Sequence, residues 1–336
     1  MRSFIVAIIL CTLLFSCASK KIPDVSNIRV TITTERFEKD FFDTTANNLL
    51  VYLKQINANS PSFVETYLTQ ILTVDPAWPA DTAAAYVNGF INAYRPVYND
   101  AEKIFNDFSP YEKEIKTGLQ FVKYYFPKYK LPQKIITYIG PADGTGDGIT
   151  KDALIIGLQV HLGKGNPLYK TTLVQETYPE YISQRFEPDY IAVNCMKNIV
   201  SDIYPEKDSE KPLVNQMIEN GKRLYILSML LPKTEEYKIM GYTKDQMKDS
   251  YAHENVIWDL FIKNSFLQLT DKNITKNYVN ESPKTQELGE GAPGNIGSFA
   301  GWQIVKKYMQ KKRATTLQEL INLDTEIIFQ EAKYKP

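Results

Sequence analysis

Histidine and cysteine are scarce in this chain, and their scarcity excludes several kinds of catalytic and metal site. The 336 residues include only two histidines, His161 and His253. His253-Glu254 begins the zinc-peptidase pattern His-Glu-x-x-His, but Ile257 stands where a second histidine would be needed one helical turn later. The chain also has no Gly-x-Ser-x-Gly segment, which argues against a serine hydrolase of the nucleophile-elbow type.

The chain also lacks net charge, because 39 basic side chains balance 39 acidic ones. No basic patch stands out, so we expect no nucleic-acid partner. Residues 140–148 are rich in Asp and Gly, but they lack the ligand series of a calcium loop and the Gly-Lys-Ser/Thr ending of a phosphate loop. We interpret them as a turn and predict neither a metal nor a cofactor.

The longest apolar run is at the N-terminus and is too short to span a bilayer. A basic Arg2 precedes the run, residues 4–15 form it, and Leu14-Phe15-Ser16-Cys17 follows the lipobox pattern. We predict a signal peptide over residues 1–16, lipidation of Cys17 with acyl chains such as palmitate, and a linker over 17–26. The alternative is an ordinary secretory signal that happens to contain a cysteine.

Lipidation would tether the protein to a membrane of the cell envelope, since each buried methylene contributes about 0.8 kcal/mol. No acidic cluster follows Cys17, which favours the periplasmic side. Cys11 would leave with the signal peptide, so Cys195 is the one thiol left in the mature chain and no internal disulfide can form. We expect Cys195 to be buried and unreactive, as free cysteines usually are.

Hydrophobic periodicity predicts an α+β fold, mostly helical, with one small antiparallel sheet. The expected organisation is a mainly helical region over residues 27–130 and an α+β region over 131–336 packed against it. Strands are expected at 28–34, 134–140 and 152–163, the last two as a hairpin around the turn at 140–148. Helices are expected at 47–56, 62–72, 82–94 with Asp81 as its cap, 100–108, 109–126, 190–203, 213–231, 244–250, 251–267, 298–310 and 316–333.

A glycine-rich segment from Gly289 to Gly297, reading Gly-Glu-Gly-Ala-Pro-Gly-Asn-Ile-Gly, precedes one of these helices. Its glycines permit positive φ and a close approach of backbones. Two interpretations stay open at this point. The segment is either a loop that packs on the core and starts a helix, or a loop that lines a binding cleft.

Three features together resemble the gliding-motility lipoprotein GldB family of Bacteroidota. These are the lipobox, the segment Arg36-Phe-Glu-Lys-Asp-Phe-Phe, and Gly291-Ala-Pro-Gly-Asn-Ile-Gly-x-x-x-Gly-Trp-Gln-Ile-Val. The similarity extends over nearly the whole mature chain, and its C-terminal motif is the most specific part. The resemblance implies a role in gliding or in the associated protein secretion, in a cell that need not itself glide.

The second half also resembles, more distantly, zinc peptidases of the His-Glu-x-x-His type. The resemblance implies a degenerate zincin-like region in which Asn194 and Asn198 stand at the two histidine positions, Cys195 at the general base and Glu219 at the third ligand. Residues 155–162 would then match the substrate-binding edge strand. Amides are poor zinc ligands, and no carboxylate would remain to activate water.

We therefore expect a binding-only cleft in a lipoprotein that assembles or stabilises motility or secretion machinery, with envelope proteins as partners. One alternative is an active envelope peptidase or cell-wall hydrolase; another is a lipoprotein that binds a solute or glycan. The candidate cleft comprises His161, Asn194, Cys195, Asn198, Glu219, Pro293, Gly294 and Gly297.

Overall fold

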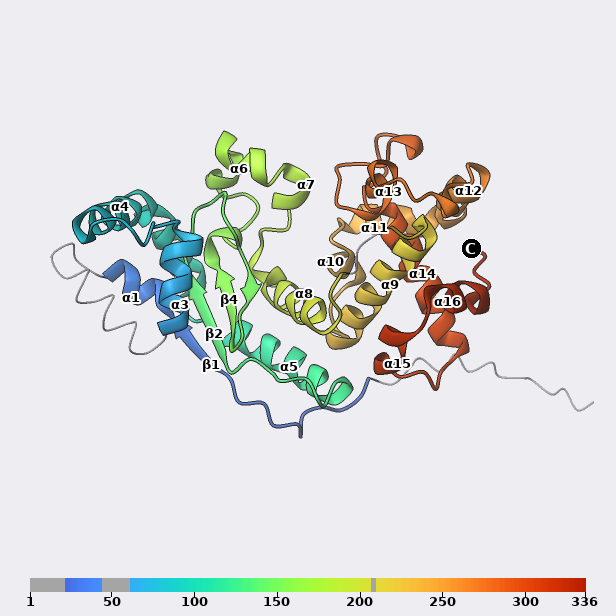
Figure 1. The fold of residues 1–336 in the computed structure, drawn as a ribbon, viewed down its shortest axis with the longest axis horizontal. Coiled ribbons are helices and arrows are strands. Elements are labelled where there is room, and N and C mark those ends of the chain that lie inside the picture. The colour runs from blue at the N-terminus through green and yellow to red at the C-terminus, as the bar shows by residue number, and fades with distance from the viewer. Residues whose placement is uncertain (1–21, 44–60, 207–209) are drawn as a thin grey trace, which may run out of the picture.

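Figure 1 shows the fold in a computed structural model, which describes residues 22–43, 61–206 and 210–336. The predicted signal peptide, Cys17 and the predicted helix at 47–56 lie outside the described residues. Within those ranges, no helix combines the length and the hydrophobicity needed to cross a membrane. The α+β class with a single small sheet is confirmed for the described part of the chain.

The sheet is mixed, so the predicted antiparallel arrangement is wrong. Its strands lie in the order β1 (Thr33–Arg36), β2 (Lys134–Tyr138), β4 (Ala153–Gly157) and β3 (Gly148–Ile149). The first three strands run parallel, and only the two-residue β3 is antiparallel to β4. β2 and β4 do not form the predicted hairpin, because the residues between them return the chain to the end of the sheet at which β2 begins, and β4 then runs parallel to β2. A parallel connection of this kind needs roughly a dozen residues or more.

Two strand boundaries also differ from prediction. The first strand begins at Thr33 rather than Ile28; the buried Val30 and Ile32 precede the paired residues. The third predicted strand ends at Gly157, where the chain turns into a short 3-10 helix, Leu158–Val160. Since β4 lies between β2 and β3, it is not the edge strand that the peptidase resemblance implied.

The remaining elements are helices; those predicted at 109–126, 190–203, 213–231, 244–250 and 298–310 begin and end within about two residues of the observed bounds, whereas the helices at 172–177, 236–240 and 272–279 were not predicted. The helix expected at 316–333 divides into two, and a π-helical turn (Tyr67–Ile71) follows α3. The α-helices are α1 (Phe37–Asp43), α3 (Pro61–Thr66), α4 (Ala80–Phe105), α5 (Ser109–Tyr125), α6 (Thr172–Thr177), α7 (Glu180–Ser183), α8 (Ile191–Ile203), α9 (Leu213–Leu230), α10 (Glu236–Met240), α11 (Lys244–Ala252), α12 (Glu254–Lys263), α13 (Lys272–Val279), α14 (Ile296–Lys311), α15 (Leu317–Asn322) and α16 (Thr325–Ala332). Further 3-10 turns are Pro167–Lys170, Pro188–Tyr190, Phe266–Gln268 and Gln286–Leu288.

Helix α4 departs most from prediction. The two helices expected at 82–94 and 100–108 form one continuous helix that runs through Pro96. Its N-cap residue is Pro79, and no side chain caps it, so the predicted cap at Asp81 is wrong; Asp81 lies in the first turn. A carboxylate there is still favourably placed against the helix dipole.

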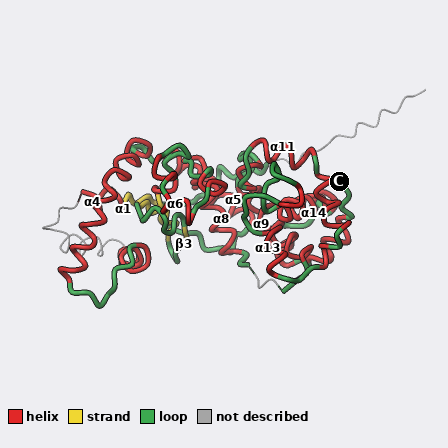
Figure 2. The backbone as a smooth tube through the Cα atoms, turned by 90° about the horizontal axis from the view of Figure 1, so that it is seen from above, coloured by secondary structure: helices red, strands yellow, loops and turns green. Residues whose placement is uncertain are grey.

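The sheet and the later helices form the two ends of an elongated molecule (Figures 1 and 2). Helices α1, α3 and α4 lie with the sheet at one end, and α9 to α16 form the other. Helices α5 and α8 lie between them. In the strand pair β1–β2, a strand from the expected region 27–130 pairs with one from the expected region 131–336. The division of the chain into these two regions stays a prediction.

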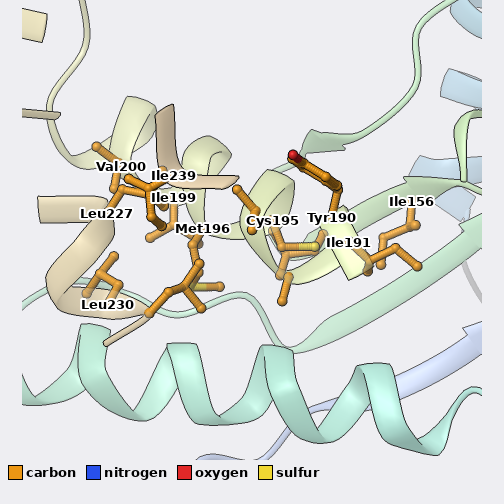
Figure 3. Packing of buried hydrophobic residues seen from close by; sticks show 14 of the residues in the cluster. Ile156, Tyr190, Ile191, Cys195, Met196, Ile199, Val200, Leu227, Leu230 and Ile239 are labelled. Atoms are coloured by element: carbon orange, nitrogen blue, oxygen red, sulfur yellow. The ribbon is translucent and has the colours of Figure 1, made fainter. Parts of the chain in front are cut away.

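Helix α8 contributes to the core between the two ends (Figure 3). Its buried side chains include Cys195, Met196 and Ile199; Ile199 lies near Leu227 of α9, and Cys195 lies near Ile191. On the α5 side, Gly118 makes the close approach possible: a Cβ there would lie 2.7 Å from the Met196 sulfur. This packing fixes α8, and with it the polar residue Asn194 on its first turns.

Candidate functional site

The residues predicted to form one cleft occupy distinct surroundings in the structure. His161 and Asn194 share a partner, Cys195 is buried in the α8 core, and Glu219 belongs to a network with a tyrosine and lysines. Pro293, Gly294 and Gly297 belong to the loop before α14 and its first turn. Sequence reasoning named His161 and Asn194 among the cleft residues without pairing them, and it missed the residue that joins them, Asp147.

Asp147 is the centre of the first group. It lies at the end of the Asp/Gly turn, immediately before β3, and its side chain is only 5% exposed. One carboxylate oxygen accepts hydrogen bonds from His161 Nε2 and Asn194 Nδ2, both at 2.8 Å, and the other accepts from the Gly157 amide at 3.2 Å. The carboxylate thus connects the sheet, the turn after β4 and helix α8.

The two ring nitrogens of His161 both face acceptors. Nε2 contacts the Asp147 carboxylate, and Nδ1 lies 3.2 Å from the Glu187 carbonyl oxygen. Both contacts are satisfied only when both nitrogens carry a proton, which describes an imidazolium. Burial favours a low pKa for His161, but the charge and hydrogen bond of Asp147 outweigh it and raise the pKa. The pair is therefore a buried ion pair.

Cys195 follows Asn194 but faces the core. Its side chain is 1% exposed, and burial raises the pKa of the thiol well above its usual value, with the Asp147 charge adding to the effect. Only the thiolate is a good nucleophile, so this thiol is poorly suited to covalent catalysis. Asn198 lies one turn after Asn194 on the same face of α8 and is half-buried.

Glu219, on α9, lies in a network of its own. Its carboxylate accepts a hydrogen bond from the Tyr204 hydroxyl and lies 3.8 Å from the amino groups of both Lys211 and Lys222. Lys222 is 1% exposed and also donates to the Leu323 carbonyl at 2.6 Å. The network connects α9 with the turn between α15 and α16, so Glu219 already has partners.

The loop before α14 is held by close backbone contacts. The Tyr242 hydroxyl donates to the Gly294 carbonyl at 2.8 Å, and the Thr285 hydroxyl donates to the Pro293 carbonyl at 2.7 Å. A Cβ at Gly294 would lie 2.0 Å from the Ser282 carbonyl oxygen, so only glycine fits. Asn295 adopts a left-handed conformation, with φ of 57°. These contacts hold the loop in one conformation.

A small polar recess adjoins this loop and includes an ion pair that the sequence did not indicate. Arg185 donates two hydrogen bonds to Glu281, at 2.7 and 2.6 Å, in the recess lined also by Tyr242 and Pro293. Burial would raise the pKa of Glu281, but Arg185 lowers it to about 2. The free space is about 30 Å³, enough for roughly two waters.

Metal-binding groups do not gather in the described ranges, where no three His, Cys, Asp or Glu side chains lie close enough to hold an ion. Asn194, which the peptidase resemblance places at a ligand position, is hydrogen-bonded to Asp147. Asp147 itself stands in the Asp/Gly segment, which was the one sequence feature from which it could have been found.

Comparison with known proteins decides the family. A family model described as gliding motility protein GldB matches residues 18–336. The chain belongs to the GldB family. The match includes both the sheet and the helical end, so membership concerns the whole fold and not a single motif. It makes this GldB-family chain a protein related to gliding motility and associated with the cell envelope. No curated protein and no solved structure matched the chain.

Proposed function

We propose that this GldB-family protein is anchored to an envelope membrane by lipid on Cys17 and acts by binding other proteins of the motility or secretion machinery, without catalysing a reaction. The lipobox at Leu14-Phe15-Ser16-Cys17 supports the anchor. The observation that carries the non-catalytic part is the mutual pairing of the polar groups expected in the cleft.

A hydrolytic site needs a group free to bind metal or to take a proton from water. In this protein the imidazole of His161 and the amide of Asn194 both contact the Asp147 carboxylate. Glu219 accepts from Tyr204 and faces two lysines. Each candidate group therefore has a structural role, which supports binding over catalysis.

The anchor is tested in cells that express the full chain with an alkyne-tagged fatty acid in the medium. Wild-type protein should take up the label and sediment with membranes, whereas Cys17→Ala should lose the label and leave the membrane fraction. Cys11→Ala is the matched control, because Cys11 lies in the predicted signal peptide and should leave labelling intact. Undiminished labelling of the Cys17→Ala protein would overturn the proposal.

The non-catalytic role is tested by complementing a strain that lacks this protein. Glu219→Gln keeps the shape of the side chain and can still accept from Tyr204, but it removes the counter-charge of the buried Lys222 and should lower the melting temperature. At matched levels of folded protein, spreading motility should be retained, as it should be with the exposed control Glu65→Gln. Loss of motility with Glu219→Gln alone, at a level of folded protein equal to that of the wild type, would contradict the proposal. Stoichiometric zinc in the purified protein, together with peptide hydrolysis, would replace it with the peptidase alternative.

A further inference from the structure

A second and larger recess lies on the other side of Pro293, between the α11–α12 corner and the loop before α14. We name it the corner recess and define it by Asp249, His253, Val256, Ile257, Leu288 and Ile296. Its free volume is about 330 Å³, against about 30 Å³ for the recess at Arg185. Pockets that bind small ligands usually measure about 300–1,000 Å³, so the corner recess is large enough for one.

The walls of the corner recess are held in place without a ligand. On the helix side, both the backbone amide and Nδ1 of His253 donate to the Asp249 carbonyl, at 3.0 and 2.9 Å. On the loop side, the Ala292 amide donates to the Gly289 carbonyl at 3.2 Å, and the Thr285 hydroxyl donates to the Pro293 carbonyl. A preformed site of this kind loses little conformational entropy on binding.

The lining of the corner recess combines aliphatic side chains with one acidic side chain. Ile257 and Ile296 are buried and form apolar surface, and Val256 at the rim is 47% exposed. Asp249 is the one acidic residue on the lining, and no lysine or arginine lines the recess. The lysines at the ends of α11 and α12 pair elsewhere, Lys244 with Glu235 and Lys263 with Asp259, and no ion pair of the described residues involves the Asp249 carboxylate. An apolar body with a positive end would match this surface, because it covers the aliphatic wall and places its charge near Asp249.

We propose that the corner recess binds an aliphatic ammonium group, with the carbon chain on Val256, Ile257 and Ile296 and the ammonium beside Asp249. A lysine side chain in a polypeptide and a free alkylamine both carry this group. The site does not depend on the proposed function, because it involves none of the residues argued there. Its failure would leave the lipid anchor and the non-catalytic role untouched.

Binding is measured by calorimetry and by NMR on the purified mature protein with three six-carbon probes that differ only at one end. Hexylammonium should bind saturably and shift resonances of residues 249–257 and 288–296. Hexanoate should bind at least roughly tenfold more weakly, since it places a negative charge near Asp249, and hexan-1-ol should be intermediate. A blocked Gly-Lys-Gly peptide distinguishes the sources: binding of the peptide alone assigns a polypeptide ligand, and binding of hexylammonium alone assigns a small molecule.

Two variants test separately the charge of Asp249 and the free volume of the corner recess. Asp249→Asn should lower the affinity for hexylammonium roughly tenfold and remove its advantage over hexan-1-ol, while Asp259→Asn, on the next helix α12 and outside the recess, should change nothing. Ala292→Leu should fill the recess and weaken all three probes. If Ala292→Leu does not fold, Val256→Trp at the exposed rim replaces it. Equal binding of hexylammonium and hexanoate, or no saturable binding up to millimolar concentration, would overturn the proposal.

Discussion

The sheet end and the helical end of this protein are held together by different physical means. The sheet end buries charged groups in pairs: Arg36 with Glu38, at 2.6 Å, and His161 with Asp147. At the helical end, α9 and α14 cross with their backbones in contact: a Cβ on Gly301 would lie 1.8 Å from the Met217 carbonyl oxygen. The helical end also buries a charge, Lys222 beside Glu219, but its α9–α14 crossing depends on the absence of a side chain at Gly301.

This difference predicts different responses to change. Paired buried charges carry a desolvation cost, and removing one partner leaves the other uncompensated. Burial raises the pKa of Glu38 even though Arg36 and the Thr137 hydroxyl oppose it. A helix crossing made by glycine responds instead to volume and hardly to pH. The His161–Asp147 pair of the sheet end should therefore be sensitive to pH, and the α9–α14 crossing of the helical end to added atoms.

The largest effect is expected from Gly301→Ala at the α9–α14 crossing. The added methyl group would overlap the Met217 carbonyl and force the two helices apart, at a cost of about 3 kcal/mol or more. Gly89→Ala is the matched control, because it also lies inside a helix but meets nothing within 4 Å, and should stabilise by about 0.5–1 kcal/mol. Urea denaturation of both variants measures the difference; a Gly301→Ala protein as stable as wild type would contradict the crossing.

The next effect is expected from Asp147→Asn at the sheet end. The substitution leaves the buried imidazolium of His161 without a counter-charge, which should cost about 3 kcal/mol near neutral pH. Asp152→Asn is the matched control, because Asp152 is exposed. It should change the free energy of unfolding by no more than about 0.5 kcal/mol. Similar denaturation midpoints for the two variants would show that the His161–Asp147 pair contributes nothing.

The penalty of Asp147→Asn should itself depend on pH. Because the pKa of His161 is raised on folding, the pair stabilises fully below the unfolded value of about 6.5 and loses its contribution as pH rises through the raised folded value. The difference between wild type and Asp147→Asn should thus be large at acid-to-neutral pH and shrink in alkali. The gap between wild type and Gly301→Ala should stay constant over the same range; a constant gap for both would contradict the ion pair.

The smallest effect tests helix capping. Thr316 forms a capping box with Glu319 at the start of α15, so Thr316→Ala should cost about 1 kcal/mol. Asp81→Ala should cost less, because Asp81 was predicted as a cap but makes no capping bond in α4. Thermal unfolding of both variants compares their losses of stability. A larger drop in melting temperature for Asp81→Ala would indicate that Asp81 caps α4 after all.

Local pattern was enough to place the helices of the core. Helices α5, α8 and α9 begin and end within about two residues of their predicted bounds, because the hydrogen bonds of a helix form within its own segment. The same local reading misjudged α4, since packing of Val87, Ile91 and Tyr98 into the core carries that helix past Pro96. Propensity marks a proline as a break, but burial on both sides of it can outweigh that preference.

Of the candidate site, composition alone indicated a buried Cys195, and the structure confirms that its thiol is inaccessible. The partners of the other residues were out of reach of sequence reasoning. His161 and Asn194 meet at Asp147, which lies 47 positions from Asn194 along the chain. Nothing in a local pattern indicates which carboxylate a buried histidine will face.

The sequence by itself determined the family, the helical character and the scarcity of catalytic groups, because these follow from residue types and from contacts within a few positions. Tertiary structure decided the direction of the strands, the His161–Asp147 pair, the glycine crossing of α9 with α14 and the corner recess. Each of these joins segments distant in the sequence, and loop closure, burial and charge pairing choose among many arrangements that the same local patterns allow.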